Sequence, residues 1–382
     1  MILRIIGKLL GLLGLLMGVV GTVLWIRYGG GESFPDRTGA PRLPGTVLEV
    51  VADLPTPPGN IAVSADGRVF VSLHPEAGPR DKVVEIVNGE PRPWPNQVFQ
   101  TGDGEPRWFH SVLSLRIDRQ GRLWTLDNGN HGFAPGRLLA FDLESGGVVH
   151  EYEFPKDIAG LGSHLNDFQV SADGKFIYIA EASFFAKTPA LVVYDVEQHR
   201  ARRLLAGHPG VTADRYTPVV QGRKMVALGL VSIRPGVDSI VLDPANEWLY
   251  FAPVTDLDLY RARTADLRND DLSAAELAGR IETFAPKTMS DGLTVDSAGN
   301  IYISDPEHSA IMVMRTDRSM ETLVRDDRLR WPDGFSFGPD GWLYVSCSAL
   351  HQIIGLPPWT FRKHAPFQIF RLRPGTPGFP GQ

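Results

Sequence analysis

The chain has 382 residues, a formal net charge of −6, 43% hydrophobic residues and 21% charged residues. These values are ordinary for a globular protein and exclude wholesale disorder, and the lack of a basic excess argues against nucleic-acid binding. The 40 Gly and 30 Pro indicate many tight turns, which favour a β-rich fold over a helical bundle. A single cysteine, Cys347, excludes an internal disulfide and a cysteine-based zinc site.

The N-terminus is predicted to be a membrane segment. Residues 9–26 (LLGLLGLLMGVVGTVLWI) form an uncharged run of about 18 residues, which is close to the shortest helix that spans a bilayer. Arg4 and Lys8 precede it, so the positive-inside rule places the rest of the chain on the periplasmic or extracellular side. We interpret residues 1–27 as an uncleaved signal anchor, with a cleaved signal peptide and a secreted protein as the alternative. Residues 28–45 are predicted to be a linker.

One hairpin pattern occurs six times in the rest of the chain. Each copy has an apolar-alternating stretch, a turn at Gly or Asn, and a second β-rich stretch. The copies are 59–73, 113–127, 166–181, 238–253, 291–305 and 333–347. Their spacing is typical of propeller blades with four strands each, so the sequence predicts an all-β, six-bladed β-propeller over 46–373, with a tail at 374–382. The segments 46–51 and 367–373 are expected to complete one blade together.

Two segments depart from the repeat. Residues 205–235 form a long insertion before the fourth copy, and we expect it to cap one face of the propeller as a loop. Residues 271–279 (DLSAAELAG) predict a short helix, with Asp271 or Ser273 as its N-cap.

One register position of the repeat is mostly polar. It lies at the start of each innermost strand and is occupied by Gly59, Leu113, Asn166, Asp238, Asp291 and Asp333. Asn60 is one residue off this register. Because innermost strands approach the propeller axis, we expect these carboxylates and amides to meet at one mouth of the channel. Each Asp also has a simpler interpretation as the cap of a turn.

Oxygen ligands in this number suit a hard divalent cation, with Ca²⁺ first and Mg²⁺ or Mn²⁺ as alternatives. The predicted metal ligands are Asp238, Asp291, Asp333 and Asn166. If the protein is an enzyme, Asp291 and Asp238 are its predicted catalytic groups, acting with the cation as Lewis acid and a carboxylate as base. The sequence contains no G-x-S-x-G, H-E-x-x-H or dinucleotide-binding fingerprint, so we expect no nucleotide cofactor.

The same mouth collects further polar residues, because the second strand of each hairpin returns to it. The predicted substrate-binding residues are Asn166, Asn60, His110, His164, Glu181 and His308. Other acids and imidazoles expected on this face are Asp127, Asp305, His74, His131 and His351. The alternative interpretation makes the histidines rim residues and the acids exposed edge charges. Trp108, Trp124, Trp331 and Phe335 are interpreted as blade packing, and Cys347 as a small buried hydrophobic residue.

Several hairpins resemble the yellow / major royal jelly protein family. The resemblance covers about 50–373 and is most specific in LYFAPVTDLDLYR (249–261) and WPDGFSFGPDGWLYV (331–345). It implies a six-bladed propeller outside the cytoplasm with a small-molecule pocket on its axis. It also implies either a role in pigment metabolism of the dopachrome-conversion type or the binding of small amines.

More distantly, the chain is similar to the gluconolactonase / senescence-marker propellers, and a third similarity is to strictosidine-synthase-like propellers. The second resemblance implies a divalent cation held by inner-strand residues, with Asn166 matching a substrate-binding Asn, Asp238 a metal-binding Asn and Asp291 a metal-binding Asp. The metal-binding Glu of that family falls at Gly59 or Asn60, neither of which is a carboxylate.

Three functions follow as hypotheses. The first is a membrane-anchored, monomeric propeller that binds or converts a small aromatic or cationic molecule in an acidic axial pocket. The second is a divalent-metal-dependent lactonase or esterase. The third is a non-catalytic scaffold at the membrane surface.

Overall fold

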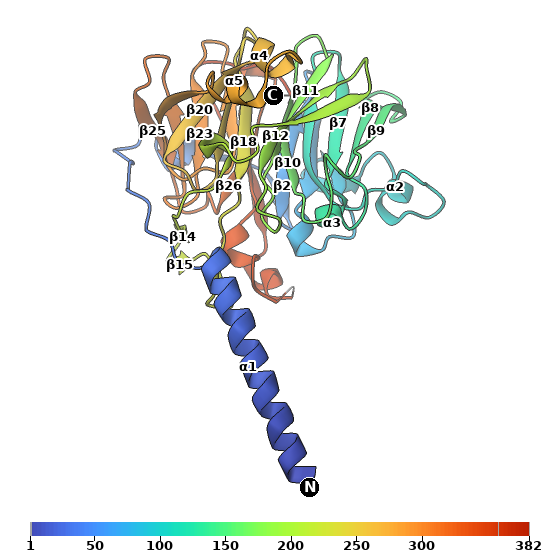
Figure 1. The fold of residues 1–382 in the computed structure, drawn as a ribbon. Helices are drawn as coiled ribbons and strands as arrows, with labels where there is room; N and C mark the ends of the chain where they lie inside the picture. The colour runs from blue at the N-terminus through green and yellow to red at the C-terminus, as the bar shows by residue number, and fades with distance from the viewer. Residues whose placement is uncertain (1, 358, 382) are drawn as a thin grey trace.

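Six antiparallel four-stranded sheets surround one axis in the computed structural model, which describes residues 2–357 and 359–381 (Figure 1). The innermost strands contact one another in the cyclic order β2, β6, β10, β18, β22, β26 and back to β2. The ring is therefore closed, and the prediction of a six-bladed propeller is confirmed.

The strands follow the predicted repeat. Blades one and two contain β2 (Pro58–Val63), β3 (Val69–Leu73), β4 (Val83–Val87), β5 (Glu90–Pro93), β6 (Val112–Ile117), β7 (Arg122–Asp127), β8 (Arg137–Asp142) and β9 (Val148–Glu153). Blades three and four contain β10 (Leu165–Val170), β11 (Phe176–Glu181), β12 (Ala190–Asp195), β13 (Arg200–Leu204), β18 (Val237–Leu242), β19 (Trp248–Pro253), β20 (Asp258–Arg263) and β21 (Glu282–Pro286). Blades five and six contain β22 (Leu293–Val295), β23 (Ile301–Asp305), β24 (Ala310–Met314), β25 (Met320–Arg325), β26 (Pro332–Phe337), β27 (Leu343–Cys347), β28 (Phe367–Leu372) and β1 (Glu49–Leu54).

The two ends of the propeller share blade six, as predicted. β1 pairs with β28 from Glu49 opposite Arg371 to Leu54 opposite Phe367. The strand starts three residues later than 46–51 suggests, because residues 45–47 form a 3₁₀ turn. β1 thus becomes the outermost strand of blade six and ties the start of the propeller to its end.

The turn chemistry explains the hairpins. All six predicted turn residues have a left-handed backbone, with φ from 60° at Asn246 to 91° at Gly67. Gly and Asn adopt this conformation at the lowest cost. The innermost strands are buried except at Asp333 of β26, which is half-buried, whereas β9 alternates between half-buried and exposed residues. Neighbouring blades cover both faces of each inner strand but leave part of each outer strand exposed to solvent. The hydrophobic core therefore lies between blades.

The insertion at 205–235 contains two hairpins rather than a plain loop. They are β14 (Val219–Val220) with β15 (Arg223–Lys224), and β16 (Val226–Ala227) with β17 (Val231–Ser232). Short helices occupy other connections: α2 (Gln97–Thr101), α3 (Gly129–Gly132), α4 (Thr264–Arg268) and α5 (Ala274–Ala278). The helix predicted at 271–279 is confirmed as α5, where Ser273 and Glu276 form a capping box.

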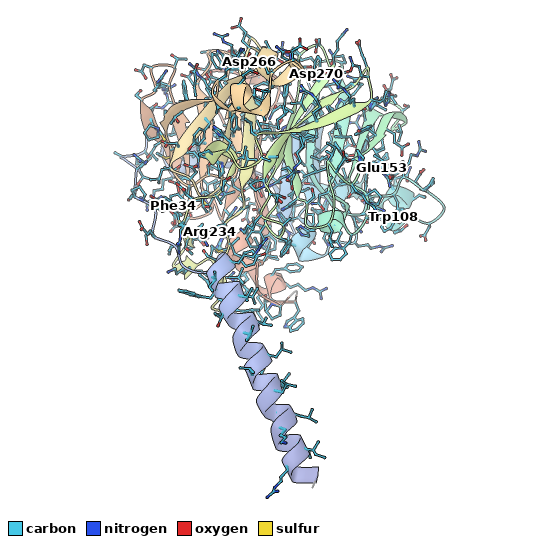
Figure 2. All side chains as sticks on the ribbon, viewed as in Figure 1. Phe34, Trp108, Glu153, Arg234, Asp266 and Asp270 are labelled. Carbon is cyan, nitrogen blue, oxygen red and sulfur yellow. The ribbon has the colours of Figure 1, made fainter. Side chains whose placement is uncertain are left out.

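The N-terminal helix α1 (Ile2–Tyr28) projects away from the propeller (Figure 1). Its segment Arg4–Tyr28 has a mean hydropathy of 2.4 and is long and apolar enough to cross a membrane. A signal sequence and a membrane anchor both meet this criterion. Figure 2 shows Arg234 beside the end of the helix that meets the propeller.

Candidate functional site

A cavity of about 340 Å³ opens on the propeller axis, at the end where the innermost strands begin. Its floor is polar and its mouth is apolar. The floor residues are Asn60 on β2, Asn166 and Asp167 on β10, Asp238 on β18, Asp333 on β26, and Asp291 just before β22. The predicted convergence of the register position on one mouth therefore holds for Asn166, Asp238, Asp291 and Asp333.

Irregular strand starts aim these side chains at the axis. The register of the first two strands shifts between Leu165 and Phe168 in blade three, between Val237 and Ser239 in blade four, and likewise in blades one, two and six. A bulge bends the strand and redirects a side chain. Such bulges are common beside functional sites, and here they turn polar residues into the cavity.

The backbone at Asp291 is held by two serines from different blades. The Asp291 N–H donates to Ser304 Oγ at 2.9 Å, and Ser239 Oγ donates to the Asp291 carbonyl, also at 2.9 Å. The next residue, Gly292, lies so close to the Asp333 carbonyl that a Cβ there would collide with it. The Asp-Gly pair thus serves close packing between blades at the floor of the cavity.

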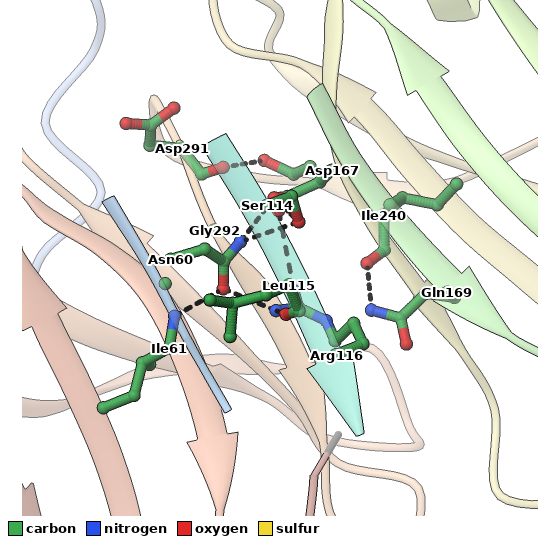
Figure 3. Close-up of polar contacts among 12 residues, drawn as sticks. Asn60, Ile61, Ser114, Leu115, Arg116, Asp167, Gln169, Ile240, Asp291 and Gly292 are labelled. Carbon is green, nitrogen blue, oxygen red and sulfur yellow. Dashed lines mark hydrogen bonds and ion pairs between the residues drawn. The ribbon is translucent and has the colours of Figure 1, made fainter. Parts of the chain in front are cut away.

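One of the floor carboxylates is paired with a buried cation (Figure 3). Arg116 Nη2 lies 3.7 Å from Asp167 Oδ2, and Arg116 Nη1 donates to Asn60 Oδ1 at 2.5 Å. Asn60 Nδ2 in turn donates to Asp167 Oδ1 at 2.5 Å and to Ser114 Oγ at 3.3 Å. Asn60 thus bridges the pair, which neutralises the Asp167 charge if both groups are ionised.

The other three floor carboxylates make no ion pair with a described residue. Burial raises the pKa of Asp291 to about 7, partly offset by a hydrogen bond from the Trp331 indole. Burial, and then the charge of Asp291, raise the pKa of Asp238 and of Asp333 well above the ordinary value. Uncompensated carboxylates in a buried site are costly, and they are characteristic of sites that bind a charged partner.

Histidines and one glutamate form a wall of the cavity. His131 Nε2 lies 3.3 Å from Glu76 Oε1, and the rings of His131 and His164 are 4.8 Å apart. Burial lowers the pKa of His164 to about 3 and that of His74 to about 4, so both are neutral at pH 7. Nδ1 of His131 and of His164 has no hydrogen-bond partner among the described residues. The wall therefore contains buried imidazole nitrogens that no described residue binds.

The mouth is apolar and is covered by the insertion, as predicted for 205–235. Its lining residues are Phe184, Phe185, Pro218, Ala227, Val231, Ile233, Pro235, Val254, Leu350 and Ile354. A cavity with apolar walls and a few convergent polar groups is the usual form of a small-molecule site.

Three predicted substrate-binding residues lie outside this cavity. The His110 ring packs on Trp108 with centroids 4.2 Å apart. Glu181 is buried one strand away from the axis, where it accepts a hydrogen bond from the His164 N–H at 2.8 Å. The His308 ring bonds to Asp305, with Nδ1 to Oδ2 at 2.9 Å. Asn60, Asn166 and His164 do line the cavity.

The sequence interpretation missed Asp167, Glu76 and the role of Trp331. Trp331 was interpreted as blade packing; it is buried, but it also lines the cavity and donates to Asp291. Trp124 and Phe335 are buried in the blade core, and Cys347 is buried as expected.

The residues of the predicted cation site are present at the cavity floor, but their side chains are not arranged around one common point. Among the residues that the structure describes, no group of three or more His, Cys, Asp or Glu side chains is arranged to hold one metal ion. Asp238, Asp291 and Asp333 instead have hydrogen-bond partners in Asn166, Trp331 and Ser348, respectively. Ca²⁺ binding therefore stays a prediction.

Trp331→Phe tests the link between the indole and Asp291. Losing the N–H donor removes a contact that favours the ionised carboxylate, so the pKa of Asp291 is expected to rise further. NMR titration of a ¹³C-labelled Asp carboxyl measures this shift, with Trp342→Phe, in the turn between β26 and β27, as the control. An unchanged Asp291 titration would contradict the proposed link.

The fold and the cavity define this protein as a six-bladed propeller with an acidic cavity on its axis. Residues 110–354 match the sequence profile of the major royal jelly protein family. The chain therefore belongs to the major royal jelly protein family, which confirms the resemblance seen in its hairpins.

Curated relatives agree with this assignment. The chain is 23% identical to major royal jelly protein 1 of Apis mellifera over 254 residues, covering 62% of this chain and 56% of the relative. It is 25% identical to major royal jelly protein 3 of Apis mellifera over 264 residues, covering 64% and 46%. The chain thus spans about half the length of the curated relatives that it matches.

Solved structures share the fold at low identity. Regucalcin from Agrobacterium tumefaciens, described as a calcium-binding protein, has a TM-score of 0.60 and 16% identity, covering 90% of this chain and 98% of that one. A gluconolactonase from Xanthomonas campestris has a TM-score of 0.54 and 14% identity, covering 91% and 98%. At such identity these neighbours support the propeller fold alone.

Proposed function

We propose that this protein binds a small molecule with a cationic group and an aromatic or other apolar body in the axial cavity. The observation that carries the proposal is the charge balance of the floor. Four carboxylates line the cavity: Asp167, Asp238 and Asp291 are buried and Asp333 is half-buried. Among the described residues, Asp167 alone is ion-paired, with Arg116. A ligand cation would compensate the remaining acids and turn their burial into binding free energy.

The rest of the cavity suits the other end of such a ligand. Its volume of about 340 Å³ is that of a site for a small molecule. Phe184 and Phe185 stand at the mouth, where aromatic edges and faces can pack on an apolar body or on a ring. The neutral histidines of the wall add hydrogen-bonding nitrogens between the acidic floor and the apolar mouth.

The same floor can also carry a proton transfer. A carboxyl with a pKa near the working pH is an effective general acid or base, and that of Asp291 is raised to about 7. If the ligand is converted, we propose Asp291 as the group that moves a proton and Asp238 as the neighbouring carboxyl. An isomerase-type conversion needs no more than this.

A metal-dependent hydrolase is the second candidate. The observation that favours it is the set of three carboxylates without an ion pair, because Asp238, Asp291 and Asp333 supply oxygen ligands of the type that Ca²⁺ prefers. A surface scaffold without small-molecule chemistry is the third.

Calorimetry on the full chain in detergent micelles separates these functions. The matched probes are 2-phenylethylamine and the neutral 2-phenylethanol, each with and without Ca²⁺, on wild type and Asp238→Asn. We expect the amine to bind at least about tenfold more tightly than the alcohol, a difference of about 1.4 kcal/mol, and Asp238→Asn to remove that preference.

The control is Asp317→Asn, which changes an exposed acid in the turn between β24 and β25 and should leave binding unchanged. Equal affinity for amine and alcohol would contradict the proposal. Ca²⁺ binding lost in Asp238→Asn, together with turnover of a lactone panel, would favour the hydrolase. No binding of amines, alcohols or Ca²⁺ would favour the scaffold.

A further inference from the structure

The membrane-length helix is joined directly to the mouth of the cavity. Arg27 Nη2 donates to the Ala186 carbonyl at 2.9 Å, and the Tyr28 hydroxyl donates to the Phe185 carbonyl at 2.9 Å. Arg234 Nη2 returns a hydrogen bond to the Tyr28 carbonyl at 3.0 Å. Phe185 itself lines the cavity, so the end of α1 and the cavity opening share one loop.

The hairpin β16–β17 runs back along α1, past the end of the apolar run. Leu230 Cδ1 lies 4.0 Å from the position of a Cβ on Gly21. Gly21, Leu24 and Tyr28 are the half-buried residues on this side of the helix, at the spacing of one helical face. Gly21 lies about 7 Å below Ile26, the last residue of the apolar run, at 1.5 Å per residue. If α1 crosses a bilayer, this hairpin reaches the level of the lipid.

The residues at the tip of the β16–β17 hairpin and around the cavity mouth are of the kind that contacts lipid. Among the described propeller residues, every exposed Leu, Phe and Trp comes from a loop that also supplies a cavity residue: Phe133, Leu161, Phe185, Leu228, Leu356 and Trp359. Leu228, at the hairpin tip, is 87% exposed. The other exposed large apolar residues of the propeller are valines on outer strands or on α2, at positions 50, 87, 98 and 149.

We call these six exposed Leu, Phe and Trp residues the apolar rim. Exposed apolar residues gathered on the loops around one cavity mark an interaction surface rather than ordinary exposure. Trp359 is followed by the exposed cations Arg362 and Lys363, the usual pairing of an aromatic ring with basic residues at a bilayer interface. Figure 1 shows α1 leaving the propeller at this face, whereas α4 and α5 lie at the opposite end.

We propose that this rim is a membrane-contact surface: α1 remains attached as an anchor, and the rim lies on the outer face of the same bilayer, so that the cavity opens onto lipid. The surface goes beyond the proposed function. One part of the proposal rests on the proposed function: the cationic ligand is then an amphiphile that enters the cavity from the bilayer. Its cationic group lies on the acidic floor and its apolar body lies nearest the lipid.

The test uses the full chain reconstituted in nanodiscs of phosphatidylcholine and phosphatidylglycerol. Leu228→Cys and Leu161→Cys place an environment-sensitive fluorophore at the hairpin tip and on another mouth loop, and Glu144→Cys places it in an exposed turn at the opposite end. The native Cys347 is buried, and burial raises the pKa of its thiol, so it should stay unlabelled.

We expect doxyl-labelled lipid to quench the labels at 228 and 161 at least about twofold, and to leave the label at 144 unchanged. No quenching at 228 and 161, or a mature chain that lacks α1, would overturn the proposal. Two copies per nanodisc with unquenched labels would assign the rim to a second copy instead. Quenching needs no ligand and calorimetry in micelles needs no bilayer, so this proposal and the proposed function fail separately.

Discussion

Asp291→Asn is expected to stabilise the folded protein above pH 7 while weakening its binding of cationic ligands. The pKa of Asp291 is raised to about 7 in the folded state, against an ordinary value of 3.8. The folded protein therefore holds a proton on this group that the unfolded chain loses between about pH 4 and 7. Stability falls as the pH rises through that window, by up to about 1.4 kcal/mol per unit and about 4 kcal/mol in all.

The amide removes this penalty and keeps an acceptor for the Trp331 N–H. It also removes a charge that raises the pKa of Asp238 and of Asp333. Thermal unfolding of the full chain in micelles, followed from pH 4.5 to 8.5, measures the effect. We expect the two melting curves to coincide at the acid end and to separate by several degrees at pH 8.

Asp317→Asn is the matched control, because Asp317 is an exposed acid far from the cavity floor and should give no gain that grows with pH. A variant that is no more stable than wild type at pH 8 would show that Asp291 is not a strained carboxyl. A variant that is more stable and still binds amines with wild-type affinity would show that the charge of Asp291 does not contribute to ligand binding. The expected exchange of stability for function is typical of binding sites.

The propeller could be predicted from the sequence because each blade repeats its local chemistry. Six turn residues with left-handed backbone fix six hairpins, and alternating apolar residues fix the faces that pack between blades. The pairing of the terminal strands followed from their position and length. The hairpins of the insertion could not be predicted, since their strands have two residues each and no periodicity of their own.

The acidic floor was predictable only in part. The common register indicated Asn166, Asp238, Asp291 and Asp333, but it passed over Asp167. In a regular strand neighbouring residues face opposite sides, so Asn166 and Asp167 should not share a cavity. The register shift between Leu165 and Phe168 breaks that alternation and turns both inward.

Sequence spacing also failed to place Glu181 and part of the cavity wall. Glu76 and His131 reach the cavity from short irregular turns, where sequence spacing does not give direction. Glu181 ends a second strand and was expected to reach the same mouth. It is at the right end of the blade but one strand too far from the axis, where Arg203 and the His164 N–H bind its carboxylate.

The affinity for a cationic ligand is expected to rise with pH between about 5 and 8, with release of protons. The pKa of Asp291 is about 7 and those of Asp238 and Asp333 are raised well above the ordinary value, so these acids hold protons that an incoming cation must displace. Below the pKa of one such group, affinity should increase by up to about tenfold per pH unit for each proton released. 2-Phenylethylamine keeps its charge throughout this range, so the slope belongs to the protein.

Calorimetric titration at pH 6, repeated in buffers with different ionisation enthalpies, counts those protons directly. We expect a release of about one proton for wild type and less for Asp291→Asn, whose floor has lost a group with a pKa of about 7. Protonated His74 or His164 would also release protons when a cation binds, but burial lowers the pKa of His74 to about 4 and that of His164 to about 3, so both are already neutral at pH 6 and do not contribute. Affinity that is flat or falls with pH would mean that the floor carboxyls do not meet the ligand. A rising affinity with proton release would identify the buried acids as the groups that exchange a proton for a ligand cation.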